Sequence, residues 1–418
     1  MSGSVQVKKI ISLIILISTL LCSCSAPQKS VENKLVETES KYIKAIWISY
    51  YELSEFTSNK SEKEFTQSIS KSFDNLNKQG FNTVIVQVRP CADAFYKSDI
   101  FPVSIYFNGI QGGEMDYDPL QIMCECAKSS SLRIEAWINP YRVSQDDDIS
   151  KLCEDNIAAK WLNNDDKKSN VVVCDNKIFF NPASDDVKKI VIKGVEEIVK
   201  NYDIDGIHFD DYFYPTTDES IDENEFLSYK ESGGKLLLDD WRRENVSDLI
   251  KKVYSTVKKI KPQVVFGVSP ASNIEKNYNT LYADVEKWVR EDGYIDYICP
   301  QIYFGFKNVY QPFMQTVKKW NKLCENTSTT LYIGLPLYKS GNVDDYASTE
   351  DDEAKNEFVN NSNIIARQIR YIEKIERIKG YFFFSYSYLE KQECEEEVSQ
   401  MYEAMQDSNL LLRLLPIQ

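Results

Sequence analysis

Eight short apolar stretches follow one another along the chain, and amphipathic or polar stretches with helical spacing lie between most of them. The predicted strands cover residues 44–50, 82–90, 133–142, 205–215, 264–270, 294–304, 330–338 and 380–389. The predicted helices cover residues 62–79, 119–129, 184–200, 239–259, 282–291, 312–324 and 362–377. A strand followed by a helix, repeated eight times, predicts an α/β protein with the fold of a (β/α)8 TIM barrel.

A doubly wound open sheet is the competing fold. It would carry a glycine-rich phosphate turn after its first strand, whereas residues 47–51 are Trp-Ile-Ser-Tyr-Tyr. This bulky turn disfavours the open sheet, and it also excludes a dinucleotide-binding site. We therefore expect no cofactor. The long linkers 91–118 and 143–180 follow the second and third strands, so they are expected as loops that build cleft walls at the carboxyl-end face.

The N-terminus has the pattern of an export signal. Lys8 and Lys9 precede the apolar run 10–21, which is shorter than the roughly 20 residues that a membrane-spanning helix needs. The following Leu21-Cys22-Ser23-Cys24 resembles a bacterial lipoprotein signal, with an ordinary secretory signal as the alternative. We therefore expect a signal peptide over 1–23, a tether over 24–42 that is anchored to the lipid bilayer through acylated Cys24, and an extracytoplasmic barrel over 43–418.

Composition narrows the functional classes. The net charge of −15 over 418 residues leaves no basic stripe to follow a phosphate backbone, so nucleic-acid binding is excluded. Eight cysteines lie beyond the signal peptide and tether and are scattered without a CxxC pair, and the chain has one histidine, so no metal site is expected. The chain is 43% hydrophobic, which suffices for a large core, and we expect a monomer.

The run Asp203 to Pro215 carries the strongest chemical signal. In an extended strand His208 and Asp210 share one face, while Asp211 falls at the turn. Two carboxylates among aromatic residues are costly to place at the end of a buried strand, which favours a catalytic edge. The alternative is that the aspartates only cap the next element.

The carboxyl ends of the other predicted strands carry polar and aromatic residues, and in a barrel these ends form the active site. With strand four they would form a cup suited to sugar binding. The residues expected to bind substrate are Arg89, Trp137, Asn139, Tyr141, Arg142, His208, Tyr212, Gln301 and Tyr303.

Glycoside cleavage uses two carboxyl groups, one as proton donor and one as nucleophile or base. Asp210 is the first candidate, and the candidates for its partner are, in falling order, Asp211, Asp93 and Glu135. Glu135 stands at the start of its strand and is expected below the cup. His208 has no Gly-x-Ser-x-Gly elbow to serve, so a hydrogen bond to a carboxylate or sugar hydroxyl, or a structural role, is expected for it.

Several motifs together resemble the bacterial glycosyl-hydrolase-like 10 family over roughly residues 42 to 390. They are Trp137-Ile138-Asn139-Pro140-Tyr141-Arg142, residues 205–215, Trp241-Arg242-Arg243-Glu244-Asn245-Val246 and Pro300-Gln301-Ile302-Tyr303. The resemblance implies a barrel, an extracytoplasmic setting and cleavage of peptidoglycan glycan strands stripped of their peptides. It also implies that Asp210, Asp211 and the segment from Arg89 to Asp93 belong to the site.

The Asp-Gly-x-x-x-Asp spacing of residues 205–210 is also similar to the nucleophile strand of α-amylase-type barrels, but the fifth strand here lacks their acidic glutamate. The sequence therefore predicts a membrane-anchored glycoside hydrolase that acts on cell-wall or related polysaccharide. A non-catalytic glycan-binding lipoprotein is the alternative. A metal-dependent polysaccharide deacetylase is disfavoured, because one histidine cannot supply the usual ligands.

Overall fold

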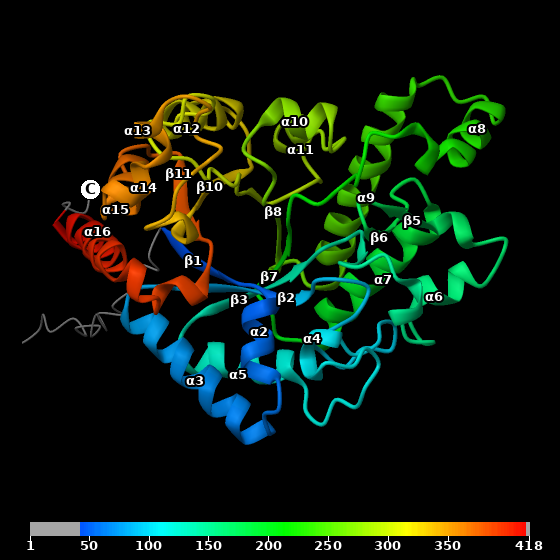
Figure 1. Ribbon diagram of the computed structural model, residues 1–418, viewed down its shortest axis with the longest axis horizontal. Helices are drawn as coiled ribbons and strands as arrows, with labels where there is room; N and C mark the ends of the chain where they lie inside the picture. The colour runs from blue at the N-terminus through cyan, green and yellow to red at the C-terminus, as the bar shows by residue number, and fades with distance from the viewer. Residues whose placement is uncertain (1–41, 415–418) are drawn as a thin grey trace, which may run out of the picture. The chain divides into compact units, whose positions relative to one another are not determined.

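The computed structural model describes the backbone of residues 42–414 and the side chains of residues 42–407. Eight parallel strands close into a barrel inside a ring of helices (Figure 1), so the predicted (β/α)8 fold is confirmed. The strands are β1 (Ile43–Ile48), β2 (Thr83–Arg89), β3 (Arg133–Ile138), β7 (Gly206–Phe209), β8 (Val265–Val268), β9 (Tyr297–Ile298), β10 (Thr330–Leu335) and β11 (Ile378–Phe383).

The barrel closes because β1 pairs with both β2 and β11; Ile46, for example, lies opposite Val84 on one side and Phe383 on the other. Alternate residues of the strands point inward, where a cluster of aromatic and small apolar side chains fills the interior. That inner cluster comprises Ala45, Trp47, Ile85, Trp137, Tyr297, Cys299 and Phe382. The outward residues pack against the helices and form the larger core.

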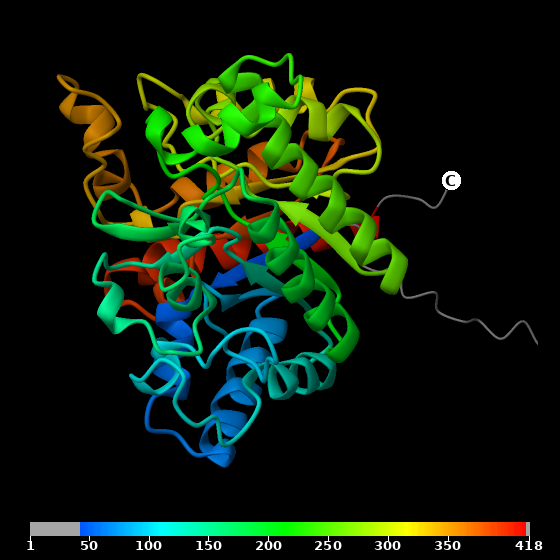
Figure 2. The ribbon, with the colours of Figure 1, turned by 90° about the vertical axis from the view of Figure 1, so that its right-hand side faces the viewer.

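The long helices lie between successive strands, as the apolar periodicity predicts. They are α3 (Glu62–Lys78), α5 (Pro119–Ser129), α7 (Asp185–Asn201), α9 (Leu238–Ile260), α12 (Phe313–Leu323) and α15 (Ile364–Ile372), and α16 (Glu395–Leu414) follows the last strand. Ser184 caps α7 by accepting hydrogen bonds from the backbone of Asp186 and Val187. Figure 2 shows the N-terminal helices, in blue, on one side of the barrel and the helices from the middle of the chain, in green, on another.

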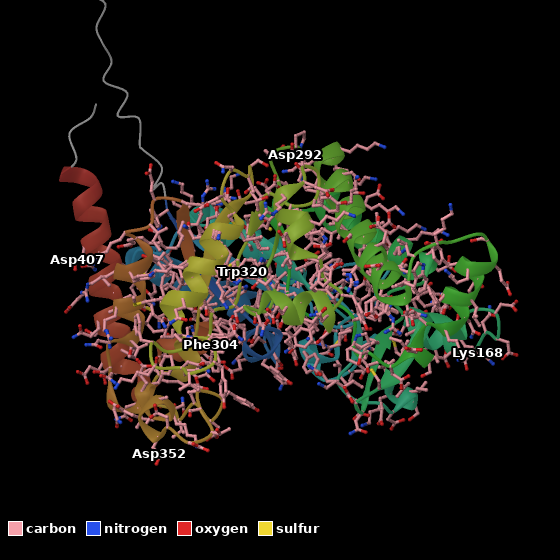
Figure 3. All side chains as sticks on the ribbon, turned by 90° about the horizontal axis from the view of Figure 1, so that it is seen from above. Lys168, Asp292, Phe304, Trp320, Asp352 and Asp407 are labelled. Carbon is pink, nitrogen blue, oxygen red and sulfur yellow. The ribbon has the colours of Figure 1, made fainter. Side chains whose placement is uncertain are left out.

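Shorter helices lie mainly in the connecting segments. They are α2 (Tyr50–Thr57), α4 (Ile105–Asn108), α6 (Ile157–Leu162), α8 (Glu223–Glu231), α10 (Ile274–Asn279), α11 (Val285–Arg290), α13 (Asp352–Lys355) and α14 (Glu357–Asn360). Among the packed side chains of Figure 3, Trp320 of α12 is fully buried and donates its indole N–H to the carbonyl of Ser272, whereas Lys168 and Asp352 lie at the surface.

The third predicted strand is wrong in its extent. β3 ends at Ile138, and Arg142 begins a separate strand, β4 (Arg142–Ser144), because Pro140 cannot donate to a ladder and the Asn139 side chain accepts the Arg142 N–H across a turn at 3.0 Å. β4 joins β6 (Lys177–Phe180) and β5 (Val171–Cys174) in a three-stranded antiparallel sheet. The linker 143–180 is thus folded around a sheet of its own.

The loop after β7 is held by a buried ion pair. Arg242 of α9 donates to both carboxylate oxygens of Asp222, at 2.6 and 2.9 Å, and also to the hydroxyl of Tyr282 and the carbonyls of Thr217 and Asp218. Both side chains of the pair are fully buried. This contact fixes the segment that follows Asp210 and Asp211.

The predicted signal peptide, the lipidation site Cys24 and nearly all of the tether lie outside the described residues. No helix within residues 42–414 is both long enough and apolar enough to cross a membrane. The eight cysteines of the described part carry free thiols, and most of them are buried.

Candidate active site

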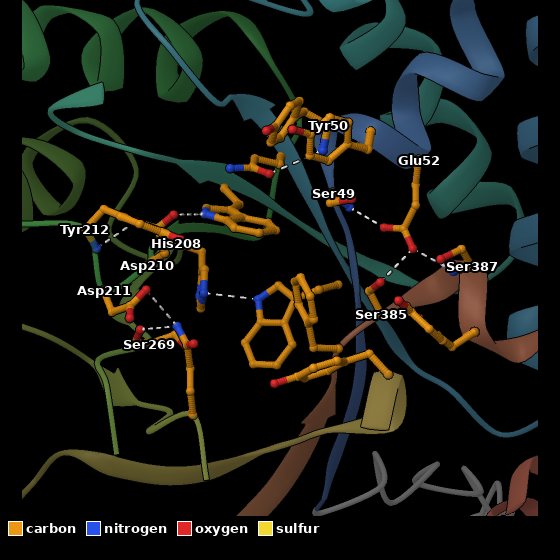
Figure 4. Close-up of a pocket in the computed structure, with 18 of the residues that line it drawn as sticks. Ser49, Tyr50, Glu52, His208, Asp210, Asp211, Tyr212, Ser269, Ser385 and Ser387 are labelled. Atoms are coloured by element: carbon orange, nitrogen blue, oxygen red, sulfur yellow. Dashed lines mark hydrogen bonds between the residues drawn. The ribbon is translucent and has the colours of Figure 1, made fainter. Parts of the chain in front are cut away.

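A cavity of about 600 Å³ opens at the carboxyl ends of the barrel strands. Most of the barrel strands contribute to its wall, as the polar strand ends predict. Eight of the predicted site residues line it, namely Trp137, Arg142, His208, Asp210, Asp211, Tyr212, Gln301 and Tyr303. Figure 4 shows Asp210 and Asp211 on one side of this cavity and Glu52, with Ser385 and Ser387, on the other.

Asp210 directly follows β7 and is 2% exposed. Its carboxyl group accepts hydrogen bonds from the Trp137 indole at 3.0 Å, from the Asn139 amide at 3.2 Å and from the backbone N–H of Tyr212 at 3.3 Å. Burial raises the pKa of Asp210 to about 6, and the charge of Asp211 acts in the same direction, while Arg142 opposes the rise. At near-neutral pH a fraction of Asp210 is therefore protonated and can donate a proton.

Asn139 is oriented by its neighbours. Its backbone N–H donates to the carbonyl of Arg89 at 2.9 Å, and its own carbonyl accepts from the Arg89 guanidinium at 3.2 Å. Because its side-chain oxygen accepts the N–H of Arg142, the amide nitrogen must face Asp210. Asn139 and Arg89 are both fully buried, so they support Asp210 from behind the cavity wall.

Asp211 is only partly buried and faces the cavity from the turn after Asp210. Its carboxyl group accepts a hydrogen bond from the Gln301 amide at 3.2 Å, and the same amide donates to the carbonyl of Ser269 at 3.0 Å. Desolvation raises the pKa of Asp211, whereas the Gln301 contact opposes the rise. Gln301 thus holds a second carboxyl group at the cavity.

His208 is the midpoint of a buried hydrogen-bond chain. The Trp47 indole, which can only donate, contacts His208 Nε2 at 3.2 Å, so Nδ1 carries the proton and donates to the Tyr297 hydroxyl at 2.7 Å. Tyr297 donates in turn to Glu135 at 2.5 Å. Burial lowers the pKa of His208 to about 3, so the ring is neutral and both nitrogens are occupied. This arrangement fits the structural role and leaves no nitrogen for base catalysis.

Five predicted site residues do not line the cavity, namely Asn139, described above, and Asp93, Arg89, Tyr141 and Glu135. Asp93 is fully buried under the linker 91–118, where it accepts from the backbone of Ile105 at 3.2 Å and from Gln111 at 3.1 Å, and it lines a separate cavity of about 350 Å³. Tyr141 and Arg89 are buried behind the wall. Glu135 lies below the cavity, as expected, where burial raises its pKa to about 7.

Two carboxylates of the cavity were missed by the sequence reasoning. Glu52 and Glu55 lie on α2, directly after β1. Glu52 accepts hydrogen bonds from the backbone of Ser49 at 2.6 Å, the hydroxyl of Ser385 at 2.7 Å and the backbone of Ser387 at 2.6 Å. The spacing Ser49-x-x-Glu52 is the signature of a capped helix start and could have placed both glutamates at the end of the first strand.

Aromatic rings complete the cavity. Tyr50 and Tyr51 pack with ring centroids 4.0 Å apart, and Tyr106 packs against Tyr50 at 4.5 Å. Tyr51 and Tyr212 are 59% and 50% exposed as whole residues. Exposed ring faces beside polar groups are suited to stacking on the apolar faces of sugars.

These features define a class. A closed (β/α)8 barrel with carboxyl groups and tyrosines in its carboxyl-end cavity has the architecture of a glycoside hydrolase. No group of three or more histidine, cysteine, aspartate or glutamate side chains in the described part of the chain could hold a metal ion.

The chain belongs to the glycosyl hydrolase-like 10 family, whose model matches residues 42–349, and the resemblance read from the sequence is thereby confirmed. It is 36% identical over 372 residues to Glycosyl hydrolase YngK of Bacillus subtilis, covering 84% of this chain and 69% of that protein. It is 30% identical over 433 residues to Glycosyl hydrolase DigH of Escherichia coli K12, covering 93% and 95%.

Among solved structures, the glycoside hydrolase domain of PgaB (BpsB) from Bordetella bronchiseptica has the same fold. It superposes with a TM-score of 0.56 at 10% identity, covering 86% of this chain and 98% of that one. Family and fold together support a glycosidase activity.

Proposed function

We propose that this protein is an exported, lipid-anchored glycoside hydrolase that cleaves the glycan strands of peptidoglycan after their peptides have been removed. The observation that carries the enzymatic part is Asp210, a buried carboxyl group with a pKa raised to about 6 in a cavity that holds further carboxylates. The export signal read from residues 1–24 supports the location, and the family supports the class of substrate.

In the proposed reaction Asp210 donates a proton to the oxygen of the leaving sugar, while an ionised carboxylate on the cavity wall acts on the sugar ring or activates a water molecule. Asp211 is the proposed partner. Its charge helps to keep the proton on Asp210, since two neighbouring carboxyl groups resist joint ionisation. Trp137 and Asn139 fix the direction of the Asp210 carboxyl group through their hydrogen bonds.

Glu52 and Glu55 are the other carboxylates of the cavity. Both oxygens of Glu52 accept hydrogen bonds from protein groups, so its position is fixed by the fold. Glu55 is exposed at the rim of the cavity. We therefore assign the chemistry to the pair that follows β7 and a structural role to Glu52, and we assign no role to Glu55.

The test compares wild-type protein with Asp210→Asn, Asp211→Asn and Glu55→Gln on peptide-free glycan strands, with reducing ends as the readout. We expect a loss of roughly 10³-fold or more for Asp210→Asn and a similar loss for Asp211→Asn, because removal of an acid or base costs about 10²–10⁴-fold. Glu55→Gln is the matched control and should retain most of the activity. Equal release of reducing ends by wild type and Asp210→Asn would refute the assignment. Glycan binding without any product would favour the non-catalytic glycan-binding alternative.

A further inference from the structure

Arg142 is the one positively charged side chain among the described residues that line the cavity. It begins β4, and its backbone N–H is fixed by the side chain of Asn139. The other charged groups of the wall are the carboxylates of Glu52, Glu55, Asp210 and Asp211. An anionic group of a substrate would therefore meet repulsion everywhere in the cavity except at Arg142.

The guanidinium group of Arg142 has unused hydrogen-bonding capacity. The residue is 4% exposed, and its guanidinium carbon lies 4.4 Å from the centre of the Tyr212 ring. Within residues 42–407 the structure shows no ion pair at contact distance and no hydrogen-bond acceptor for this guanidinium. Burial acts to lower the pKa of Arg142, but the charges of nearby groups, chiefly Asp210, together outweigh burial and raise it. A structural arginine in this protein has its hydrogen bonds occupied: Arg242 donates to both carboxylate oxygens of Asp222.

We propose that Arg142 determines specificity by binding a free carboxylate carried by a sugar of the substrate. The planar guanidinium can donate two parallel hydrogen bonds to such a group. Tyr212, which already stacks on Arg142 and is half exposed, offers its ring face to the same sugar. The inference rests on the proposed function, because it names the group by which the same site selects its glycan.

Sugars that carry such a carboxylate include amino sugars with a lactyl ether and uronic acids. In a peptidoglycan strand the lactyl carboxylate is free only where the peptide has been removed, because the peptide converts it to a neutral amide. A neutral amide carries no negative charge, so it cannot form an ion pair with Arg142. Arg142 thus supplies a physical reason for the enzyme to prefer peptide-free strands.

The experiment compares one glycan preparation in two forms, with its lactyl carboxylates free and with the same groups converted to amides. We expect wild-type protein to favour the free form by roughly 10–100-fold in kcat/KM, the usual range for a charge-assisted bidentate contact. Arg142→Gln should bring this ratio close to one. Arg142→Lys should retain part of this preference, because lysine keeps the positive charge but cannot donate two parallel hydrogen bonds. Oligosaccharides of uronic acid, used in parallel, show whether this kind of sugar is also accepted.

The ratio of the two forms separates recognition from catalysis, because a general effect of Arg142 on Asp210 alters both substrates alike. Arg243→Gln is the control variant, since Arg243 stacks on Tyr278 at 3.9 Å outside the cavity, and it should keep the wild-type ratio. Equal use of both forms by wild-type protein would overturn the inference while leaving the proposed function intact.

If wild-type protein cleaves neither form, the proposed function fails and calorimetric binding decides the inference. Binding of the free-carboxylate glycan at least tenfold tighter to wild type than to Arg142→Gln would support it. Equal binding to the two proteins would refute it.

Discussion

Asp210→Asn should inactivate the enzyme and stabilise its fold at the same time. Burial raises the pKa of Asp210 from its ordinary value of 3.8 to about 6. Below pH 3.8 the group is protonated in the folded and unfolded chains alike, and the stability is unaffected. Between pH 3.8 and 6 the unfolded chain releases this proton while the folded chain retains it, so stability falls over that window, and above pH 6 the folded chain holds a buried charge that the unfolded chain keeps in water. A displacement of about two pH units corresponds to about 3 kcal/mol of lost stability at pH 7.5.

Asparagine removes this charge with almost the same shape. Its amide group accepts through one oxygen only, so either the Trp137 indole, which donates to Oδ2, or the Tyr212 backbone N–H, which donates to Oδ1, loses its acceptor, at a cost of about 1 kcal/mol. The net expectation is a gain of about 2 kcal/mol at pH 7.5, seen in urea unfolding monitored by tryptophan fluorescence, and almost no gain at pH 4.5, where the raised pKa costs the wild type only about 1 kcal/mol. Leu335→Ala, a fully buried β10 residue, should lose about 2–5 kcal/mol at both pH values and calibrates the assay. A destabilised Asp210→Asn at pH 7.5, or a gain that does not change with pH, would refute the reasoning.

Two further predictions concern pH and the buried ion pair. If Asp210 donates the proton, kcat/KM should fall about tenfold per pH unit above roughly pH 6. Only the protonated carboxyl group is active, so its raised pKa sets the pH at which the activity begins to fall. A kcat/KM that stays constant between pH 6 and 9 would contradict this role. Arg242→Met should cost about 3–5 kcal/mol in urea unfolding, because it leaves Asp222 charged and buried, whereas Arg243→Met, with a partly exposed ion pair, should cost about 1 kcal/mol or less. Similar losses of unfolding free energy in the two arginine variants would show that the buried ion pair contributes no more to stability than the partly exposed one.

The sequence was sufficient to predict the barrel fold, because each strand and each long helix has its own periodicity of apolar residues. Asp210, Asp211 and Gln301 could be placed together, since the carboxyl ends of parallel strands meet at one face. Asp93 shows the limit of this argument. It follows the end of β2 by a few residues, but the linker folds back over it through Ile105 and Gln111, and only the tertiary structure reveals that burial.

The glutamates of α2 were overlooked for a different reason. The predicted first strand ran on to Tyr50, whereas the chain turns into a helix at that residue and carries Glu52 and Glu55 to the cavity. The extent of β3 was misjudged in the same way, because alternation of polar and apolar residues continues past Pro140. Period-two patterns thus locate a strand well but overestimate its length where a turn keeps the same alternation.

Glu52 joins the two ends of the barrel. It follows the first strand, and its partners Ser385 and Ser387 follow the last one, with more than 300 residues between them. The cavity wall is therefore incomplete until β11 has been synthesised and has docked against β1. A chain truncated before β11 is therefore expected to lack glycosidase activity, because the partners that hold Glu52 in the cavity wall are missing.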